Sequence, residues 1–388
     1  MLYLDHAATS PLLPEVLDVM LPFLCENFHN PSSVYKPARM VRATIDEARQ
    51  KIAAVVNAAP DELFFTSGGT EATNWAIKGV LAATGKRHIV TAQTEHHAVL
   101  YVCRHLEKNG YTVTYLPVCG EGFVNPADLE KAIRPGETAV VAIMLANNEV
   151  GTIQPIAGLS EIASRHGVPF LTDAVQAVGH IPVDVEDLGV QMLALSAHKF
   201  GGPKGVGALF VKKGTPMYSL LQGGAQERNR RAGTENVAGI VGMGAALEIS
   251  ARDMAMSKIP TIRDELIRRI STEIPHVKLN GATGASRLPG NVNFSFRFIE
   301  GEALLYNLDL QGCFVSTGSA CSSAALEPSH VLMALNIGHE LANGAIRFSL
   351  GTGNTPKDID RVMEILTPAV EKLRNLSPLY DDFLKGEK

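Results

Sequence analysis

The sequence predicts an α/β protein with a mainly parallel sheet and a second, smaller α+β domain. Short runs of apolar and β-branched residues alternate with amphipathic segments over the first two-thirds of the chain, a pattern typical of parallel strands joined by helices. Near Ile259 and Pro260 this alternation stops. At 388 residues the chain also exceeds the roughly 250–300 residues over which a single core grows, which favours two domains.

The expected strands of the first domain are seven short apolar runs, at residues 62–66, 88–91, 112–116, 138–144, 169–172, 192–195 and 207–211. Amphipathic segments such as 126–133 and 159–166 are the expected helices between them. The second domain is expected to contain a helix over 261–272, a strand over 291–298, a helix from Gly301 and a pair of segments at 316–321 and 345–350. We place the large domain at residues 13–256 and the small domain at residues 1–12 and 257–388.

The composition excludes several classes of protein. A hydrophobic fraction of 46% and a charged fraction of 19% are typical of a globular chain. The net charge of -5 provides no general basic field for nucleic acid or an anionic membrane, although Arg228, Arg230 and Arg231 could form a local basic patch. Because no apolar run approaches the ~18 residues of a membrane helix and the first residues do not resemble a signal peptide, we expect a cytoplasmic protein.

The five cysteines predict neither disulfides nor a metal site. They are odd in number and form no C-x-x-C pair, which argues against a disulfide framework and against zinc. Cys25, Cys103 and Cys313 fit the role of buried structural residues, and Cys119 next to Gly120 fits a turn. Cys321 differs, because small residues surround it, as in an exposed loop.

Lys199 lies in the stretch Ser196 to Gly205, just after an apolar run. This stretch resembles a phosphate-binding P-loop in its glycines and lysines, but Lys199 is followed by Phe200 and Lys204 by Gly205. A P-loop requires Ser or Thr after its lysine to bind magnesium, so that interpretation fails. A lysine in a dry pocket can instead become a nucleophile that forms an imine with an aldehyde, whereas Lys204 fits a solvated surface group.

Two further features could complete a site around Lys199. The glycine turn from Ser67 to Glu71 opens a helix, and free N–H groups at a helix start suit a phosphate; the alternative is an ordinary turn with Thr70 as a cap. Asp173 ends a strand that we expect to be buried, so it should meet a cation or a strong donor, unless it only caps the next segment. A lysine, an acid and a phosphate seat together match pyridoxal phosphate (PLP), which needs all three.

At these residues the chain resembles the NifS/IscS-type cysteine desulfurases, which are class V members of the fold-type I PLP-dependent transferases. The resemblance runs in order over nearly the whole chain. It rests on eight motifs: Leu4-Asp5-His6-Ala7-Ala8-Thr9, Thr66-Ser67-Gly68-Gly69-Thr70-Glu71, Thr94-Glu95-His96, Asn147-Asn148-Glu149-Val150-Gly151, Asp173-Ala174-Val175-Gln176, Ser196-Ala197-His198-Lys199, Arg231-Ala232-Gly233-Thr234 and Ser316-Thr317-Gly318-Ser319-Ala320-Cys321.

The resemblance implies a role for each matching residue. Lys199 would bind PLP covalently, Asp173 would keep the pyridine nitrogen protonated, Gln176 would hydrogen-bond the ring oxygen, and His96 would stack on the ring and shuttle protons. The cofactor phosphate would be held by Ser196, His198, Thr70, the Gly69 backbone and, from the neighbouring subunit of a homodimer, Thr234. Asn148 and Arg347 would hold the carboxylate of the substrate. The remaining histidines, among them His6, His29, His97 and His105, are expected to be structural or surface residues.

The implied reaction converts L-cysteine to L-alanine. The Cys321 thiolate would take the sulfur as a persulfide and pass it to an acceptor protein for iron–sulfur cluster assembly or tRNA thiolation. We expect no direct contact with nucleic acid or membrane.

Two departures from the family pattern and three alternative functions remain open. Val34 to Pro37 follow Asn30 to Ser33 where many members have a histidine close by, and the chain stops at Lys388, where members that serve an iron–sulfur scaffold usually continue. We therefore expect scaffold docking to differ. The enzymatic alternatives are a selenocysteine lyase and a class V aminotransferase, neither of which needs Cys321 for its main turnover. The third alternative is a catalytically silent interaction subunit, which would have lost the lysine or the cysteine.

Overall fold

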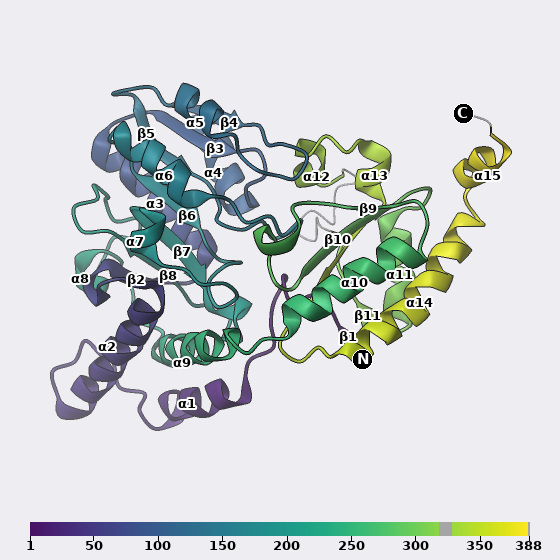
Figure 1. Cartoon of the computed structure of the whole chain (residues 1–388). Coiled ribbons are helices and arrows are strands. Elements are labelled where there is room, and N and C mark those ends of the chain that lie inside the picture. The colour runs from purple at the N-terminus through teal and green to yellow at the C-terminus, as the bar shows by residue number, and fades with distance from the viewer. Residues whose placement is uncertain (318–327, 387–388) are drawn as a thin grey trace.

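The computed structural model describes residues 1–317 and 328–386 (Figure 1). Its large sheet has seven strands in the order β2-β8-β7-β6-β5-β3-β4. Their bounds are β2 Leu63–Thr66, β3 His88–Ala92, β4 Thr112–Leu116, β5 Thr138–Ala142, β6 Phe170–Asp173, β7 Met192–Ser196 and β8 Gly207–Val211. All neighbouring pairs are parallel except those that β8 makes with β7 and β2. The prediction of a mainly parallel α/β sheet is confirmed.

Helices cover both faces of this sheet, because each face presents apolar side chains. One face and its helices form a cluster that includes Ile45, Phe170, Leu193 and Leu247. The other face forms a second cluster around Trp75, Val140 and Leu209. The helices of this part are α1 Pro14–Cys25, α2 Lys36–Val56, α3 Gly69–Thr84, α4 His97–Lys108, α5 Pro126–Ala132, α6 Ile156–Arg165, α7 Val185–Leu188, α8 Gln226–Asn229 and α9 Val237–Met254.

The rest of the chain builds a smaller α+β part with its own core around Phe294, Phe348 and Leu366. Its antiparallel sheet has the order β12-β10-β9, and a parallel pair joins β1 to β11. The strands are β1 Leu2–Tyr3, β9 Val277–Leu279, β10 Asn291–Phe296, β11 Cys313–Phe314 and β12 Ala345–Ser349. The helices are α10 Ile259–Glu273, α11 Gly301–Leu310, α12 His330–Ala334, α13 His339–Asn343, α14 Pro356–Arg374 and α15 Pro378–Lys385.

The N-terminal segment crosses between the two parts (Figure 1). Leu2 and Leu4 belong to the small core, whereas Val16 on α1 belongs to the large one. Val331 and Leu332 on α12 also pack into the large core, so this part of the C-terminal segment spans the junction. The boundaries 13–256 against 1–12 and 257–388 remain a proposal that these two cores support.

The cysteines lie partly where we expected them. Cys103 and Cys313 are buried, as predicted. Cys119 begins a turn, in which its backbone oxygen accepts from the Gly122 N–H at 2.8 Å, and its side chain is exposed. The expectation for Cys25 is wrong, because it lies exposed at the end of α1, on a helix with several exposed apolar side chains. Among the helices in residues 1–317 and 328–386, none is long and apolar enough to span a bilayer.

Candidate active site

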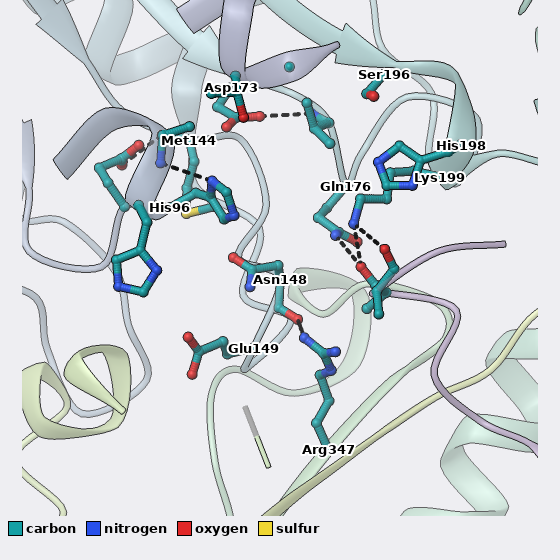
Figure 2. Close-up of a pocket in the computed structure, with 18 of the residues that line it drawn as sticks. His96, Met144, Asn148, Glu149, Asp173, Gln176, Ser196, His198, Lys199 and Arg347 are labelled. Atoms are coloured by element: carbon teal, nitrogen blue, oxygen red, sulfur yellow. Dashed lines mark hydrogen bonds between the residues drawn. The ribbon is translucent and has the colours of Figure 1, made fainter. Parts of the chain in front are cut away.

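A cavity of about 430 Å³ lies where the central strands end, between the two parts of the chain (Figure 2). Such crevices beyond the carboxyl ends of parallel strands are where α/β proteins bind ligands. The cavity is lined by most of the predicted site residues: Gly69, Thr70, His96, Asn148, Asp173, Gln176, Ser196, His198, Lys199 and Arg347. Thr234 does not line it, and Cys321 lies outside the described residues.

Lys199 enters the cavity from a short 3-10 turn that follows β7. Its Nζ donates hydrogen bonds to the backbone oxygens of Ala7 at 2.6 Å and Ala8 at 2.9 Å (Figure 2). Nε2 of Gln176 donates to the same Ala7 oxygen at 2.9 Å. The N-terminal segment therefore passes directly over the lysine and holds its amine and the Gln176 amide at one point.

Asp173 ends β6, the strand next to β7, and its side chain is buried against the cavity. Oδ1 accepts a hydrogen bond from the Val175 N–H at 3.0 Å, so the carboxylate caps the following turn as well as facing the cavity. Burial raises the pKa of Asp173 to about 6, while the Val175 N–H and the charge of Lys199 act in the opposite direction. A cation placed beside this carboxylate would favour its ionised form.

His96 is the N-cap of α4, and its Nδ1 accepts a hydrogen bond from the Ala98 N–H at 3.1 Å. Burial lowers the pKa of His96 to about 4, and the neighbouring charges of Lys199 and His97 add to this. The ring is therefore neutral at physiological pH. Because Nδ1 is an acceptor, the ring proton is on Nε2.

The cavity continues toward the start of α3, where a second hollow is lined by residues 67–71 together with Ser196, His198, Lys204 and Gly205. The helix has 16 residues, and its first backbone N–H groups have no partner within the helix, which suits an anion. Gly68, rather than Thr70, is its N-cap. A Cβ on Gly69 would lie 2.6 Å from Cγ2 of Val175, so only glycine leaves the backbone close to this strand end. These donors fit a phosphate group.

Arg347 lies on β12 at the opposite side of the cavity and is itself buried. Nη2 forms an ion pair with Asp5 at 2.8 Å. Nη1 donates to the Asn148 backbone oxygen at 2.9 Å (Figure 2). Nε is buried and has no hydrogen-bond partner among the described residues. The guanidinium is thus held rigidly at the cavity wall and suits a carboxylate ligand.

Sequence reasoning missed two buried carboxyl groups in the wall. Oε1 of Glu95 accepts from the Met144 N–H at 2.8 Å, while Oε2 is buried without a partner in the described part of the chain. Burial raises the pKa of Glu95 well above its ordinary value, and the nearby Asp173 carboxylate adds to this. Glu149 accepts a hydrogen bond from the Ser329 hydroxyl, and burial raises its pKa to about 7. Both glutamates lie inside the motifs that carry the family resemblance, and this position could have marked them as site residues.

Two histidines of the wall were also missed. His97, which we expected to be structural or on the surface, lines the cavity, and its ring centroid lies 4.8 Å from that of His330. Nε2 of His330 donates to the Glu95 backbone oxygen at 3.0 Å. His330 comes from α12, which only the tertiary fold brings to this position, so the sequence carried no signal for it.

Comparisons with known proteins agree with this geometry. Residues 2–362 match the family described as Aminotransferase class-V, whose members use PLP. The chain is 54% identical to cysteine desulfurase IscS of Dictyoglomus turgidum over 390 residues, covering 100% of this chain and 98% of that protein. It is 50% identical to cysteine desulfurase IscS of Methanosarcina thermophila, covering 97% and 94% of the two chains.

Solved structures give the same result. A structure titled "NIFS-LIKE PROTEIN" superposes with a TM-score of 0.88 at 36% identity and covers 96% of this chain and 99% of its own. A second structure, "SspA in complex with cysteine", has a TM-score of 0.81 at 33% identity and covers 92% and 100%. The chain therefore belongs to the class V aminotransferase family of PLP-dependent enzymes and, within it, to the IscS-type cysteine desulfurases.

Proposed function

We propose that the residues around this cavity carry the desulfurase reaction, in which L-cysteine becomes L-alanine and Cys321 receives the sulfur as a persulfide. The observation that carries the proposal is the convergence of three residues on one cavity that leads to a helix N-terminus: Asp173 at the end of β6, Lys199 in the turn after β7, and Arg347 in the middle of β12. When bound, PLP supplies an electron sink for the α-carbon of the amino acid.

The residues of the large part would hold the cofactor. Lys199 is the only lysine that lines the cavity of about 430 Å³ within the described part of the chain, and its amine is the group that can bind the aldehyde. Asp173 would pair with the protonated pyridine nitrogen, which would supply the partner that its buried carboxylate needs. Gln176 lies beside the Lys199 amine, and Gly69, Thr70, Ser196 and His198 would hold the phosphate.

The opposite wall would hold the substrate. The Arg347 guanidinium lines the cavity and would pair with the substrate carboxylate. Asn148 also lines the cavity, next to Arg347, and would contribute its side-chain amide. A relative whose structure is titled as a complex with cysteine supports the choice of amino acid. The neutral His96 ring would stack on the cofactor and move protons at the reacting carbon.

Cys321 would complete the reaction from the segment outside the described residues. Its thiolate attacks the sulfur of the bound cysteine, an S–S bond forms, and the Cβ–S bond breaks. The electron pair of that bond remains with the carbon, which takes a proton to give alanine. A nucleophile on an acceptor protein of iron–sulfur cluster assembly or tRNA thiolation then takes the outer sulfur, the S–S bond breaks, and the Cys321 thiolate is released.

A homodimer with a shared phosphate site belongs to this proposal. Thr234 is exposed and does not line the cavities of its own chain at this site, which is compatible with a contact to a second copy. A cytoplasmic location also remains a prediction.

The proposal is tested by comparing Cys321→Ala with Cys119→Ala, an exposed cysteine that serves as a matched control. Purified variants are mixed with L-cysteine and a thiol reductant, and alanine and sulfide are measured. We expect Cys321→Ala to retain PLP and to bind cysteine while forming neither product, and Cys119→Ala to turn over like the parent enzyme. Product formation by Cys321→Ala at the parent rate would point to direct elimination and would refute the assigned role.

A further inference from the structure

Three consecutive non-glycine residues, Glu227, Arg228 and Asn229, have left-handed backbone conformations. Their φ angles are 45°, 56° and 63°. Such a conformation is unfavourable for residues with a side chain and is rare in succession. It persists only where the surroundings fix it, and such outliers gather at ligand-binding and catalytic sites. The turn from Gln226 to Asn229 is therefore a candidate functional element.

Contacts to the edge strand β2 hold this turn. The Glu227 carboxylate pairs with Arg49 through two hydrogen bonds of 2.8 Å and accepts a third from the Phe65 N–H at 2.9 Å. Both side chains of the ion pair are buried. Arg49 and Arg228 both donate to the Leu63 backbone oxygen, at 2.8 and 2.6 Å. The strained turn thus satisfies the backbone groups that β2 presents at the free edge of the sheet.

A second contact, an ion pair, lies two residues beyond the turn. Arg231 pairs with Glu71 through Nε at 2.8 Å and Nη2 at 3.0 Å. Glu71 in turn accepts a hydrogen bond from the Ser67 N–H at 2.8 Å. β2 ends at Thr66 and α3 begins at Gly69. The contacts of Glu227 with β2 and the Arg231–Glu71 ion pair therefore fix the chain immediately before and immediately after the glycine turn.

Protection of a sheet edge explains the contacts of Glu227 and Arg228 with β2. It does not explain Arg231, whose ion pair reaches past the strand to the first turn of α3. The three arginines that could have formed a basic patch are engaged internally, since Arg230 also donates to the Met217 backbone oxygen at 2.8 Å. These contacts therefore do not favour the binding of an external polyanion.

We propose that residues 227–231 form a brace that holds the turn 67–70 in the geometry that binds the cofactor phosphate. The inference rests on the proposed function, because it assumes that the PLP phosphate occupies that turn. Glu227 and Arg231 are positioning residues, which act on the ligand through β2 and Glu71 and do not touch it.

The test uses two variants of the full-length enzyme. Arg49→Met/Glu227→Gln removes both charges of the buried pair, which avoids an uncompensated buried charge, and the glutamine can still accept from Phe65. Arg231→Gln leaves that pair intact. The matched control is Arg42→Met/Glu235→Gln. Arg42 and Glu235 form an ion pair at 2.6 Å that joins α2 to the segment beyond Thr234, and within the described part of the chain neither side chain hydrogen-bonds to β2 or Glu71. Thermal unfolding of each PLP-free protein establishes that it is folded.

Affinity is measured by reconstituting PLP-free protein with PLP and, separately, with pyridoxal, which lacks the phosphate. We expect Kd for PLP to rise about tenfold in each brace variant, while Kd for pyridoxal and kcat at saturating PLP stay within about twofold of the parent. The control should remain within about twofold for both ligands. The proposal is refuted if a folded brace variant has an unchanged Kd for PLP. It is also refuted if Kd for pyridoxal rises as much as Kd for PLP.

A double-variant cycle separates the brace from an effect through Thr234. If Arg231 acts on the turn 67–70, the fold-losses in PLP affinity caused by Arg231→Gln and by Thr234→Ala should multiply in the double variant. If the double variant binds PLP as tightly as Thr234→Ala alone, Arg231 does not position the turn 67–70 and the proposal is wrong. Failure of the proposed function gives a different result, because the parent protein would then bind PLP no better than pyridoxal.

Discussion

Replacing Glu149 by glutamine should make the PLP-free enzyme more stable at alkaline pH. Glu149 lines the cavity, is almost fully buried and accepts a hydrogen bond from Ser329. Burial raises the pKa of its carboxyl from 4.5 to about 7, while the Ser329 hydroxyl and the Arg347 charge lower it by less. Glutamine has nearly the same shape, keeps an oxygen for Ser329 and carries no charge.

The sign and size of the effect follow from proton linkage. A carboxyl whose pKa is higher in the folded state favours folding while it is neutral, and this contribution is lost as the pH rises through the folded value. The difference between 4.5 and about 7, at about 1.36 kcal/mol for each pH unit, corresponds to ~3 kcal/mol. The glutamine variant should therefore resemble the parent near pH 4.5 and exceed it by up to ~3 kcal/mol at pH 8.

The assay is thermal unfolding of both PLP-free proteins at several values between pH 5 and pH 8, with Tm as the readout. A difference of ~3 kcal/mol corresponds to about 5 °C or more in a domain of a few hundred residues. Glu371→Gln, on the exposed surface of α14, is the control. A difference in Tm between parent and Glu149→Gln that stays constant over this range would refute the burial argument.

Three further predictions concern the cofactor site. Lys199→Ala should abolish the visible absorbance of covalently bound cofactor and all turnover; cofactor that stays covalently attached would remove Lys199 from its role. Asp173→Asn should still bind PLP but lose at least ~10²-fold in kcat, because the ionised partner of the pyridine nitrogen is gone; a kcat near that of the parent enzyme would contradict this. Gly69→Ala should weaken PLP binding about tenfold, since the added Cβ lies 2.6 Å from Val175. Gly158→Ala, which meets nothing within 4 Å, is its control, and equal PLP affinities for the two variants would refute the steric argument.

Local sequence pattern was sufficient for the large sheet. All seven strands form where apolar, β-branched runs predicted them: two match to the residue, and the other five have ends that differ by at most two residues. The run at 138–144 ends as a strand at Ala142, although the Ile143 N–H still donates to the Leu171 backbone oxygen at 3.1 Å, and Met144 already lines the cavity. The direction of β8 was not predictable from its composition, since an antiparallel strand at this position is equally apolar.

The site shows where such reasoning ends. Lys199 and Asp173 were predictable because each ends a strand, and parallel neighbours bring their ends together. His330, which lines the cavity, and Ser329, which donates to Glu149, were not, because packing of α12 on the large core brings them there. The left-handed turn at 227–229 also leaves no signal, since none of its residues is a glycine and its conformation depends on Arg49, 178 positions away from Glu227.

The most direct test of the central claim is to incubate the purified enzyme with L-cysteine, without reductant, and to locate added sulfur by intact-protein and peptide mass spectrometry while alanine is measured. We expect a single added sulfur on the peptide that contains Cys321, together with alanine, and none on the peptides of the exposed Cys25 and Cys119. Alanine without sulfur on the Cys321 peptide, or sulfur only on Cys25 or Cys119, would contradict it.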